Sequence, residues 1–340
     1  MSIEREIFSS SGPFHLQNID WSNAIHRRSV AASLVQGAYN LEHDRKGSSH
    51  SQAPPWWEFF GFQLHEVLVD DDDGSYFGAI YESKYYNQYS HCNPPRYVIA
   101  FRGTLTTPEN RKQDLILDFQ FIRHNLHKCS RFDRALQAVL SIVATTCPGN
   151  VWLAGHSLGS AIALIVGRKM VSMNKSYLET YLFNPPFDSP PIERIKHEKI
   201  KDGIRIASSF LIAGLASMVH QHQEKTEEMN DDSFGTLCEW VPYLFLNRSD
   251  PISCEYIGYF AHREKMVQIG AGKIGQTATQ NSVVSVVSDA IGKDYEAVHL
   301  IPSAYLTINL SHVSDIKQAH GIQQWWRPDI HCDFKFYRYK

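Results

Sequence analysis

The sequence predicts an α/β fold, with a mostly parallel, doubly wound sheet and a helical insertion. Short apolar segments of the kind that form buried strands recur at 97–101, 151–154, 180–183, 243–246 and 305–310. Segments with the spacing of helices alternate with several of them, and this alternation favours a parallel sheet. In such a sheet, functional groups gather at the carboxyl ends of the strands. We expect 305–310 to be the last core strand.

Length and composition favour one large domain over 1–340. The chain has 340 residues, of which 43% are hydrophobic, and a formal net charge of −3. A sheet of this class with insertions commonly takes up that length. Basic residues do not outnumber acidic ones, which argues against a nucleic-acid partner. The longest apolar run, Ile204 to Val219, is too short and too polar to span a bilayer.

Cysteine usage and the N-terminal segment predict a cytoplasmic protein. The six cysteines lie far apart without any Cys-x-x-Cys pair, which favours free thiols over a disulfide framework. Met1 to Leu16 contains Glu4, Arg5 and Glu6 and lacks the apolar core of a signal peptide. The oligomeric state is left open.

The N-terminal part predicts a helix, a loop and a hairpin. Trp21–Leu41 has the spacing of an amphipathic helix, and Glu42–Pro55 has the composition of an exposed loop. Gln63–Val69 and Tyr76–Glu82 flank Asp70-Asp71-Asp72-Asp73-Gly74, which together predict a β-hairpin. The four aspartates lack the alternating ligands of a calcium loop, so we expect a solvated turn and no metal.

The most informative stretch is Gly155-His156-Ser157-Leu158-Gly159. It follows the apolar strand 151–154 and precedes a small-residue helical pattern at 160–167. A strand, a sharp turn and a helix in this order are typical of the nucleophile elbow of α/β hydrolases, with Ser157 at its apex. Glycines at both ends let strand and helix pass closely, and the Leu158 amide faces the space above the serine. The alternative interpretation is an ordinary surface turn.

A serine nucleophile needs a carboxylate and a histidine from later parts of the chain. In this fold the acid comes before the histidine. Asp250 closely follows the strand 243–246 and is the favoured acid. Asp188, which follows the strand 180–183, is the second choice.

The histidine is harder to choose, because the chain contains seventeen. His156 is excluded because neighbouring residues of an elbow point apart. The base should come from a loop after the last core strand, which leaves His312, His320 and His331 open. His299, just upstream of that strand, is a further candidate.

Developing negative charge on the substrate requires two preorganised hydrogen-bond donors. One is the Leu158 amide. The other should come from the loop after the strand 97–101, where Gly103-Thr104 fits, and the Thr104 hydroxyl offers a further donor.

Four segments occur in the order found in class 3 lipases. They are Phe101-Arg102-Gly103-Thr104, Gly155 to Gly159, Asn247-Arg248-Ser249-Asp250-Pro251 and Ala319-His320-Gly321. The chain resembles most closely a plant branch of lipase-like proteins that are often labelled GDSL esterase/lipase, although no such tetrapeptide occurs in it. Arg27 to Ala32 and His320 to Trp326 support this resemblance, which covers roughly residues 20 to 340.

The resemblance implies a role for each candidate. Ser157 is the nucleophile, Asp250 the acid, His320 the base, and Thr104 with Leu158 the oxyanion donors. One departure from the family pattern is Pro251 directly after the acid, which bears on the assignment of Asp250. Ser160 after the elbow is a small departure. A larger one is the insertion at 190–240, which replaces a short connection. It is either a cap over the site or a buried helix with a solvated loop.

The expected function is a serine hydrolase that cleaves a carboxylic ester, with a lipid or another hydrophobic acyl substrate implied by the resemblance. No cofactor or metal is expected. An acyltransferase or a specialised-metabolism enzyme with the same triad is one alternative. A non-catalytic binding or signalling protein of the same fold is another.

Overall fold

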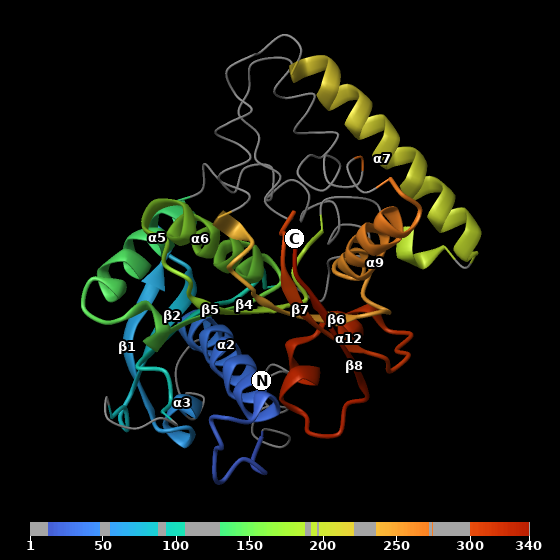
Figure 1. Cartoon of the computed structure of the whole chain (residues 1–340). Helices are drawn as coiled ribbons and strands as arrows, with labels where there is room; N and C mark the ends of the chain where they lie inside the picture. The colour runs from blue at the N-terminus through green and yellow to red at the C-terminus, as the bar shows by residue number, and fades with distance from the viewer. Residues whose placement is uncertain are drawn as a thin grey trace.

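The computed structural model describes residues 13–47, 55–87, 93–105, 130–187, 192–195, 197–220, 236–271, 274 and 300–339 (Figure 1). Asp188 and His299, two of the candidate site residues, lie outside these residues.

The strands form one eight-stranded sheet in the order of the sequence. Strands β3 to β7 run parallel, while β1, β2 and β8 are antiparallel to their neighbours. The expected parallel sheet is thereby confirmed. The strands are β1 (Phe62–Val69), β2 (Tyr76–Ser83), β3 (Tyr97–Phe101), β4 (Val151–His156), β5 (Glu179–Phe183), β6 (Tyr243–Asn247), β7 (Ala304–Asn309) and β8 (Cys332–Tyr337).

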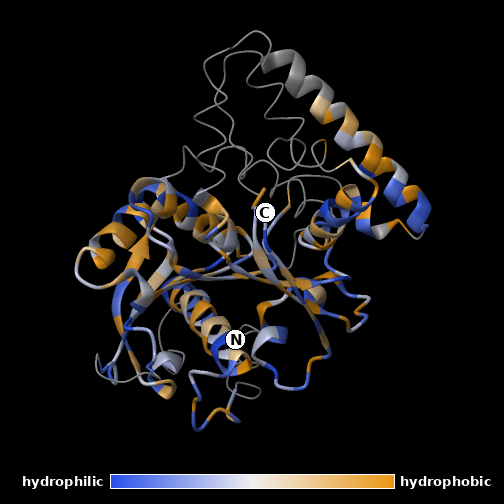
Figure 2. Ribbon diagram, viewed as in Figure 1, coloured by the Kyte–Doolittle hydropathy of each residue, from blue (hydrophilic) through white to orange (hydrophobic). Residues whose placement is uncertain are grey.

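Helices cover both faces of this sheet, with α2 on one face and α5, α6 and α9 on the other (Figure 1). Helices α2, α5 and α7 carry hydrophobic segments (Figure 2), and the buried apolar residues of α2, α5 and α6 belong to the core. The helices are α2 (Ala24–Lys46), α3 (Trp56–Phe59), α5 (Ser130–Val143), α6 (Leu158–Asn174), α7 (Glu198–His220), α9 (Glu255–Gln268) and α12 (Ile316–His320). Short 3-10 turns are η2 (Pro148–Asn150), η3 (Ile192–Arg194) and η4 (Ile322–Trp326).

The expected amphipathic helix near the N-terminus differs from the observed one in length and surroundings. Helix α2 extends to Lys46, so the loop expected from Glu42 begins later, and Glu42 is buried. All residues from Arg28 to Asn40 are buried, because the sheet covers one side of α2 and η4 packs against it as well. Some polar groups on the helix find partners within it and others outside it. Ser33 Oγ donates to the Ser29 carbonyl at 2.7 Å, whereas Arg28 donates to the carbonyls of Trp325 and Arg327.

The segment 305–310, expected as the last core strand, forms the buried strand β7, but it is not the last strand of the sheet. Strand β8 follows it, pairs antiparallel with β7 and closes one end of the sheet. Its sequence, Cys-Asp-Phe-Lys-Phe-Tyr, alternates charged and aromatic residues because it lies at an edge and is not buried on both faces.

The hairpin of β1 and β2 is confirmed, but its aspartates are not all solvated. Asp70 is only 4% exposed. It accepts a hydrogen bond from Ser130 Oγ at 2.6 Å and forms an ion pair with Arg131, so it anchors the first turn of α5. The expected solvated turn is therefore wrong for Asp70, because a helix from later in the chain packs against the hairpin.

Helix α7 is the main described part of the 190–240 insertion. It rests on α9 through polar contacts, including an ion pair between Arg205 and Glu255. Ile200, Ile204 and Phe210 are exposed, so the first half of α7 is only partly buried. In the part of the chain that the structure describes, no helix combines the length and apolar character needed to cross a membrane.

Candidate active site

The elbow holds Ser157 between β4 and α6. Its backbone has φ 57° and ψ −124°, a conformation that a non-glycine residue rarely adopts. The two flanking glycines make this turn possible. A Cβ atom on Gly155 would lie 2.3 Å from the Gly159 carbonyl oxygen, and one on Gly159 would lie 2.2 Å from the Phe101 carbonyl oxygen. Neither close approach leaves room for a side chain.

Ser157, His320 and Asp250 lie together at the carboxyl ends of the parallel strands. His320 Nε2 is 2.9 Å from Ser157 Oγ, and His320 Nδ1 is 2.9 Å from Asp250 Oδ2. The Asp250 side chain is fully buried, while the His320 side chain is 14% exposed. The geometry allows a proton to pass from the serine hydroxyl to a histidine whose other nitrogen is held by a carboxylate.

Asp250 is surrounded by donors. Its Oδ2 accepts hydrogen bonds from Ser253 Oγ at 2.6 Å and from Asn184 Nδ2 at 2.8 Å, and its Oδ1 accepts one from the Ile252 amide at 3.0 Å. Burial by itself would raise the pKa of Asp250, but the charge and hydrogen bond of His320 and the bonds from Ser253 and Asn184 lower the pKa below its ordinary value. The carboxylate therefore stays ionised beside the imidazole.

Asn184 supports the acid from a neighbouring strand and is a site residue that the sequence motifs do not predict. It directly follows β5 and has a φ of 47°. Its Oδ1 accepts a hydrogen bond from Trp325 Nε1 at 2.6 Å, and its Nδ2 also lies 3.3 Å from the Ala319 carbonyl oxygen. The signal that could have revealed it is a polar residue immediately after a buried parallel strand.

The loop that carries His320 is fixed by Gln324 in η4. The Gln324 Nε2 group donates to the carbonyls of Ala319 and Gly321 at 2.8 and 2.9 Å. Its Oε1 accepts from the side-chain amides of Asn247 and Asn309, at 2.8 and 2.9 Å. One glutamine thus joins the ends of β6 and β7 to the backbone on both sides of the histidine.

The loop after β3 lies against the elbow. A Cβ atom on Gly103 would come within 2.8 Å of the Ser157 Cβ, so this glycine lets the loop approach the serine. Thr104, the next residue, is exposed at the surface above the strand ends. Leu158 is the first residue of α6, and its amide is one of the N–H groups that a helix leaves without an intrahelical partner. The loop that carries Thr104 therefore lies beside Ser157, and Leu158 directly follows the serine.

His156 links these parts. Tyr39 Oη accepts a hydrogen bond from the Gly103 amide at 2.7 Å and lies 2.8 Å from His156 Nδ1. His156 Nε2 lies 2.7 Å from the His320 carbonyl oxygen, which can only accept, so Nε2 carries the proton and Tyr39 donates to Nδ1. Burial, followed by the nearby charge of His320, lowers the pKa of His156 to about 3, so this imidazole is neutral.

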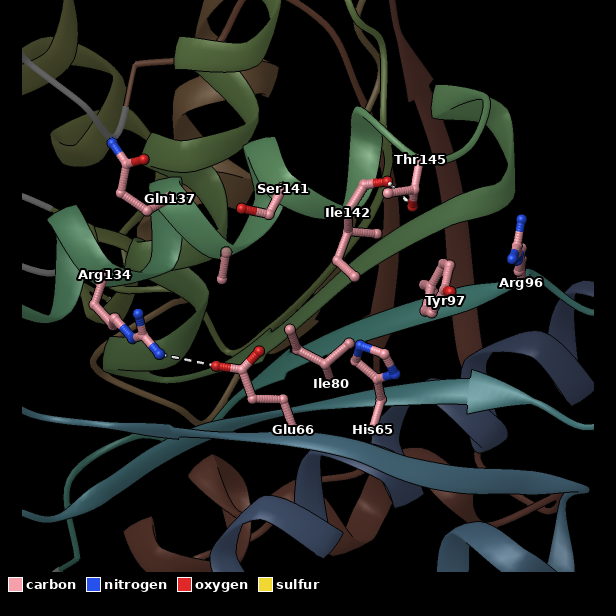
Figure 3. Close-up of a pocket in the computed structure, with 11 residues that line it drawn as sticks. His65, Glu66, Ile80, Arg96, Tyr97, Arg134, Gln137, Ser141, Ile142 and Thr145 are labelled. Atoms are coloured by element: carbon pink, nitrogen blue, oxygen red, sulfur yellow. Dashed lines mark hydrogen bonds and ion pairs between the residues drawn. The ribbon is translucent and has the colours of Figure 1, made fainter.

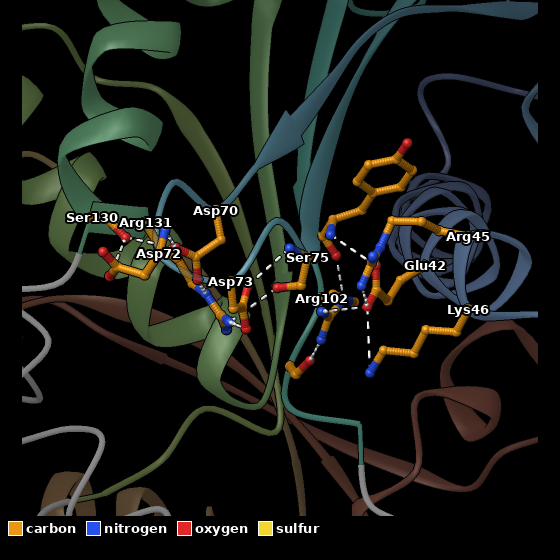
Figure 4. A network of polar contacts seen from close by, with 12 residues as sticks. Glu42, Arg45, Lys46, Asp70, Asp72, Asp73, Ser75, Arg102, Ser130 and Arg131 are labelled. Atoms are coloured by element: carbon orange, nitrogen blue, oxygen red, sulfur yellow. Dashed lines mark hydrogen bonds and ion pairs between the residues drawn. The ribbon is translucent and has the colours of Figure 1, made fainter.

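A second polar network, centred on Arg102 and Glu42, connects the loop after β3 to helix α2 and strand β2 (Figure 4). Arg102 donates to the carbonyls of Tyr76 and Gly103, and its guanidinium lies 3.8 Å from the carboxylate of Glu42 on α2. Arg45 forms an ion pair with the Glu42 carboxylate at 2.6 Å, and the Tyr76 amide donates a hydrogen bond to the same carboxylate at 2.8 Å. Burial would raise the pKa of Glu42, but these donors and charges bring it to about 2.

Two of the other candidate histidines are described. His312 and His331 are exposed. The second candidate acid, Asp188, and the fourth candidate histidine, His299, lie outside the described residues. Of the described candidates, His320 is the histidine that the fold brings to Ser157 and Asp250.

A cavity of about 480 Å³ lies elsewhere, between β1, β3 and α5 (Figure 3). Tyr97, which begins β3, lines it, whereas Ser157 sits beyond the opposite, carboxyl end of the parallel strands. An ion pair of 2.8 Å between Arg134 and Glu66 crosses it. Among the described residues, no group of three or more His, Cys, Asp and Glu side chains is arranged to hold a metal ion.

A parallel sheet, a strand–serine–helix turn and a histidine and aspartate from later loops define the class: the chain has the α/β-hydrolase fold. It is 47% identical to a protein of Arabidopsis thaliana named as a GDSL esterase/lipase, over 354 aligned positions that cover 100% of both chains. The chain belongs to the same esterase/lipase family, and the expectation of a hydrolase is confirmed at that level. No protein-family model matches it.

Two solved structures show a weaker likeness. A lipase from Rhizopus microsporus var. chinensis has 11% identity and a TM-score of 0.34, covering 69% of this chain and 70% of its own. Brefeldin A esterase, described as a bacterial homologue of human hormone sensitive lipase, has 13% identity and a TM-score of 0.28. The match covers 86% of this chain and 92% of the esterase. At these scores neither contributes to the assignment of residues.

Proposed function

We propose that the chain is a serine ester hydrolase that works through Ser157, His320 and Asp250. The hydrogen-bonded series from the serine hydroxyl to the imidazole to the buried carboxylate carries this proposal, with 2.9 Å at each of its two links. A serine hydroxyl is a poor nucleophile by itself, and a histidine in this position can take up its proton.

In the proposed reaction, Ser157 Oγ forms a bond to the acyl carbon while its proton moves to His320 Nε2. The carbonyl electrons move onto oxygen, where the amides of Thr104 and Leu158 donate hydrogen bonds to the negative charge. The ester C–O bond then breaks, and His320 gives the proton to the leaving alcohol. Water repeats the sequence on the acyl-enzyme, and Asp250 stabilises the imidazolium in both halves.

A hydrophobic acyl substrate and membership of class 3 lipases are the finer parts of this proposal. The order of the four segments in the chain supports the class, and the exposed Ile200, Ile204 and Phe210 on α7 support an apolar surface on the 190–240 insertion. We take this insertion to be a cap within a single 1–340 domain. If the insertion is a cap, binding of a long-chain phosphonate should slow amide hydrogen exchange in α7. Unchanged exchange would contradict the proposal that the insertion is a cap.

The triad is tested by labelling the folded chain with a fluorophosphonate and mapping the adduct by mass spectrometry. We expect the label on Ser157 and its loss in Ser157→Ala, which should also lose turnover of p-nitrophenyl esters. In Asp250→Asn, kcat should fall by about 10³-fold or more with little change in KM. Ser141→Ala, on α5, is the matched control. An unlabelled Ser157 in folded protein would overturn the proposal.

The choice of histidine has its own test. Alanine substitutions of His299, His312, His320 and His331 should reduce kcat strongly at His320 alone. Loss confined to another of these positions would contradict the proposed base.

A further inference from the structure

Strand β8 lies at the end of the sheet. It pairs antiparallel with β7, and among the residues that the structure describes no strand lies on its other side. An edge strand carries a row of backbone N–H and C=O groups that can pair with another strand. The outward backbone groups and the side chains of β8 therefore determine which strand can pair with it.

The pairing with β7 determines which backbone groups point outward. The Leu310 amide donates to the His331 carbonyl at 2.9 Å, and these two residues continue the register of β7 and β8. Bonded and non-bonded pairs alternate along an antiparallel ladder. The amides and carbonyls of Cys332, Phe334 and Phe336 consequently point away from β7 and are available to another strand.

The side chains of β8 leave an aromatic surface exposed. Phe334 is 65% exposed and Phe336 is 50% exposed, on the face that also carries Tyr305, which is 42% exposed. The rings of Phe336 and Tyr305 stack with their centroids 4.5 Å apart. Large aromatic side chains exposed side by side on an edge strand are characteristic of interaction surfaces.

The opposite face of β8 carries one residue of each charge. Asp333 and Lys335 are each 40% exposed at the side chain, and they lie 4.0 Å apart within the strand. If the strand pairs antiparallel with an identical strand and Phe334 lies on the two-fold axis, each Asp333 faces Lys335 of the partner subunit. Opposite charges placed directly across a ladder stabilise the pairing.

The two neighbouring registers that use the same outward groups are less favourable. Pairing of Cys332 with Phe334 of the partner subunit would set two Asp333 side chains face to face. Pairing of Phe334 with Phe336 of the partner subunit would do the same for two Lys335 side chains. Like charges directly opposite destabilise a strand pair. The strand is thus complementary to itself in one register.

We propose that this chain forms a homodimer by antiparallel pairing of β8 with β8 of a second copy, centred on Phe334, which joins the two sheets into one. The outward backbone groups supply the hydrogen bonds, the exposed aromatic rings meet on one face, and the Asp333 and Lys335 side chains meet on the other. The partner is a second copy because the charge pattern fits itself.

Sedimentation velocity of the full chain over a range of concentrations tests this proposal. We expect a dimer whose dissociation constant rises about 10-fold or more in Asp333→Lys and in Lys335→Asp, because each change converts both symmetric charge pairs into repulsive ones. The double variant Asp333→Lys/Lys335→Asp restores opposite charges and should restore the dimer. Asp329→Lys, outside the strand, should leave it unchanged.

A cross-link checks the register independently. Residues directly opposite in a bonded pair have Cα atoms about 5.5 Å apart, within the range of a disulfide. Phe334→Cys should therefore form a covalent dimer on mild oxidation, whereas Asp329→Cys should not. A chain that stays monomeric at all concentrations overturns the proposal, as does a dimer that is insensitive to the charge changes. A different protein bound at β8 of a monomeric chain also counts against it.

Discussion

The hydroxyl of Tyr39 lies 2.8 Å from Nδ1 of His156, and this contact joins helix α2 to the nucleophile elbow. The same hydroxyl holds the Gly103 amide, and the far side of the imidazole holds the His320 carbonyl. One tyrosine and one neutral histidine therefore connect the loop after β3 with the backbone of the proposed base. The hydrogen bonds of these two side chains go to each other and to loop backbone, so we regard both as positioning residues.

Tyr39→Phe should lower kcat about 10-fold with little change in KM, because a shift in the loops misaligns groups that are needed in the reaction. It leaves the Gly103 amide and His156 Nδ1 without their buried partner, so the free energy of unfolding should fall by about 1–3 kcal/mol. Steady-state kinetics and urea unfolding measure the two effects. Tyr177→Phe, at an exposed position, is the control. An unchanged kcat would contradict the positioning role.

The lowered pKa of His156 predicts a dependence of stability on pH. An unfolded histidine binds a proton near pH 6.5, whereas the folded imidazole has a pKa of about 3. The unfolded state therefore binds more protons as the pH falls below 6.5, and the folded state loses stability in that direction. His15 and His262, whose pKa values are also lowered, add slope of the same sign.

His156→Gln keeps an acceptor and a donor but removes the titration. Its slope of stability against pH between 6.5 and 4.5 should be smaller than that of the unmodified chain, by up to about 1.4 kcal/mol per pH unit. Urea unfolding at several pH values measures this difference. An NMR titration in which His156 takes up its proton near pH 6.5 would refute the lowered pKa.

Glu42 should stabilise the fold when it is ionised. Its pKa is lowered from 4.5 to about 2, which corresponds to about 3 kcal/mol above pH 4.5 that is lost as the pH falls toward 2. Glu42→Gln should remove this contribution and leave Arg102 without its carboxylate. Glu58→Gln, whose side chain is 55% exposed and pairs with Lys84 at 3.6 Å, should have little effect. Equal unfolding energies for the two variants would contradict this prediction.

Gly159→Ala should damage the elbow. The new methyl group would meet the backbone of Phe101 at 2.2 Å, and backbone on both sides leaves nothing that can rotate away. The free energy of unfolding should fall by about 3 kcal/mol, with loss of fluorophosphonate labelling. Gly149→Ala, where nothing lies within 4 Å of the added atom, is the matched control. Wild-type labelling in Gly159→Ala would show that the contact can relax.

The sequence by itself determined the features that are encoded over short stretches of chain. The buried strands could be predicted because each is a continuous apolar run, and the elbow because its glycines, serine and flanking segments lie within twenty residues. Asp250 and His320 could be named as candidates because the fold orders its loops along the chain. Motif order also indicated the esterase/lipase family, which the Arabidopsis relative confirms.

Tertiary structure decided what depends on residues that are far apart. Glu42 has the local sequence of a solvated loop, yet it is buried because β2 and Arg102 come to it from later in the chain. Asn184 and Gln324 could not be assigned to the site from the sequence, because their partners lie at the ends of other strands and in the segment 319–325. The alternation in β8 predicts neither its pairing nor its exposed edge, since strand neighbours are determined only when the sheet is assembled.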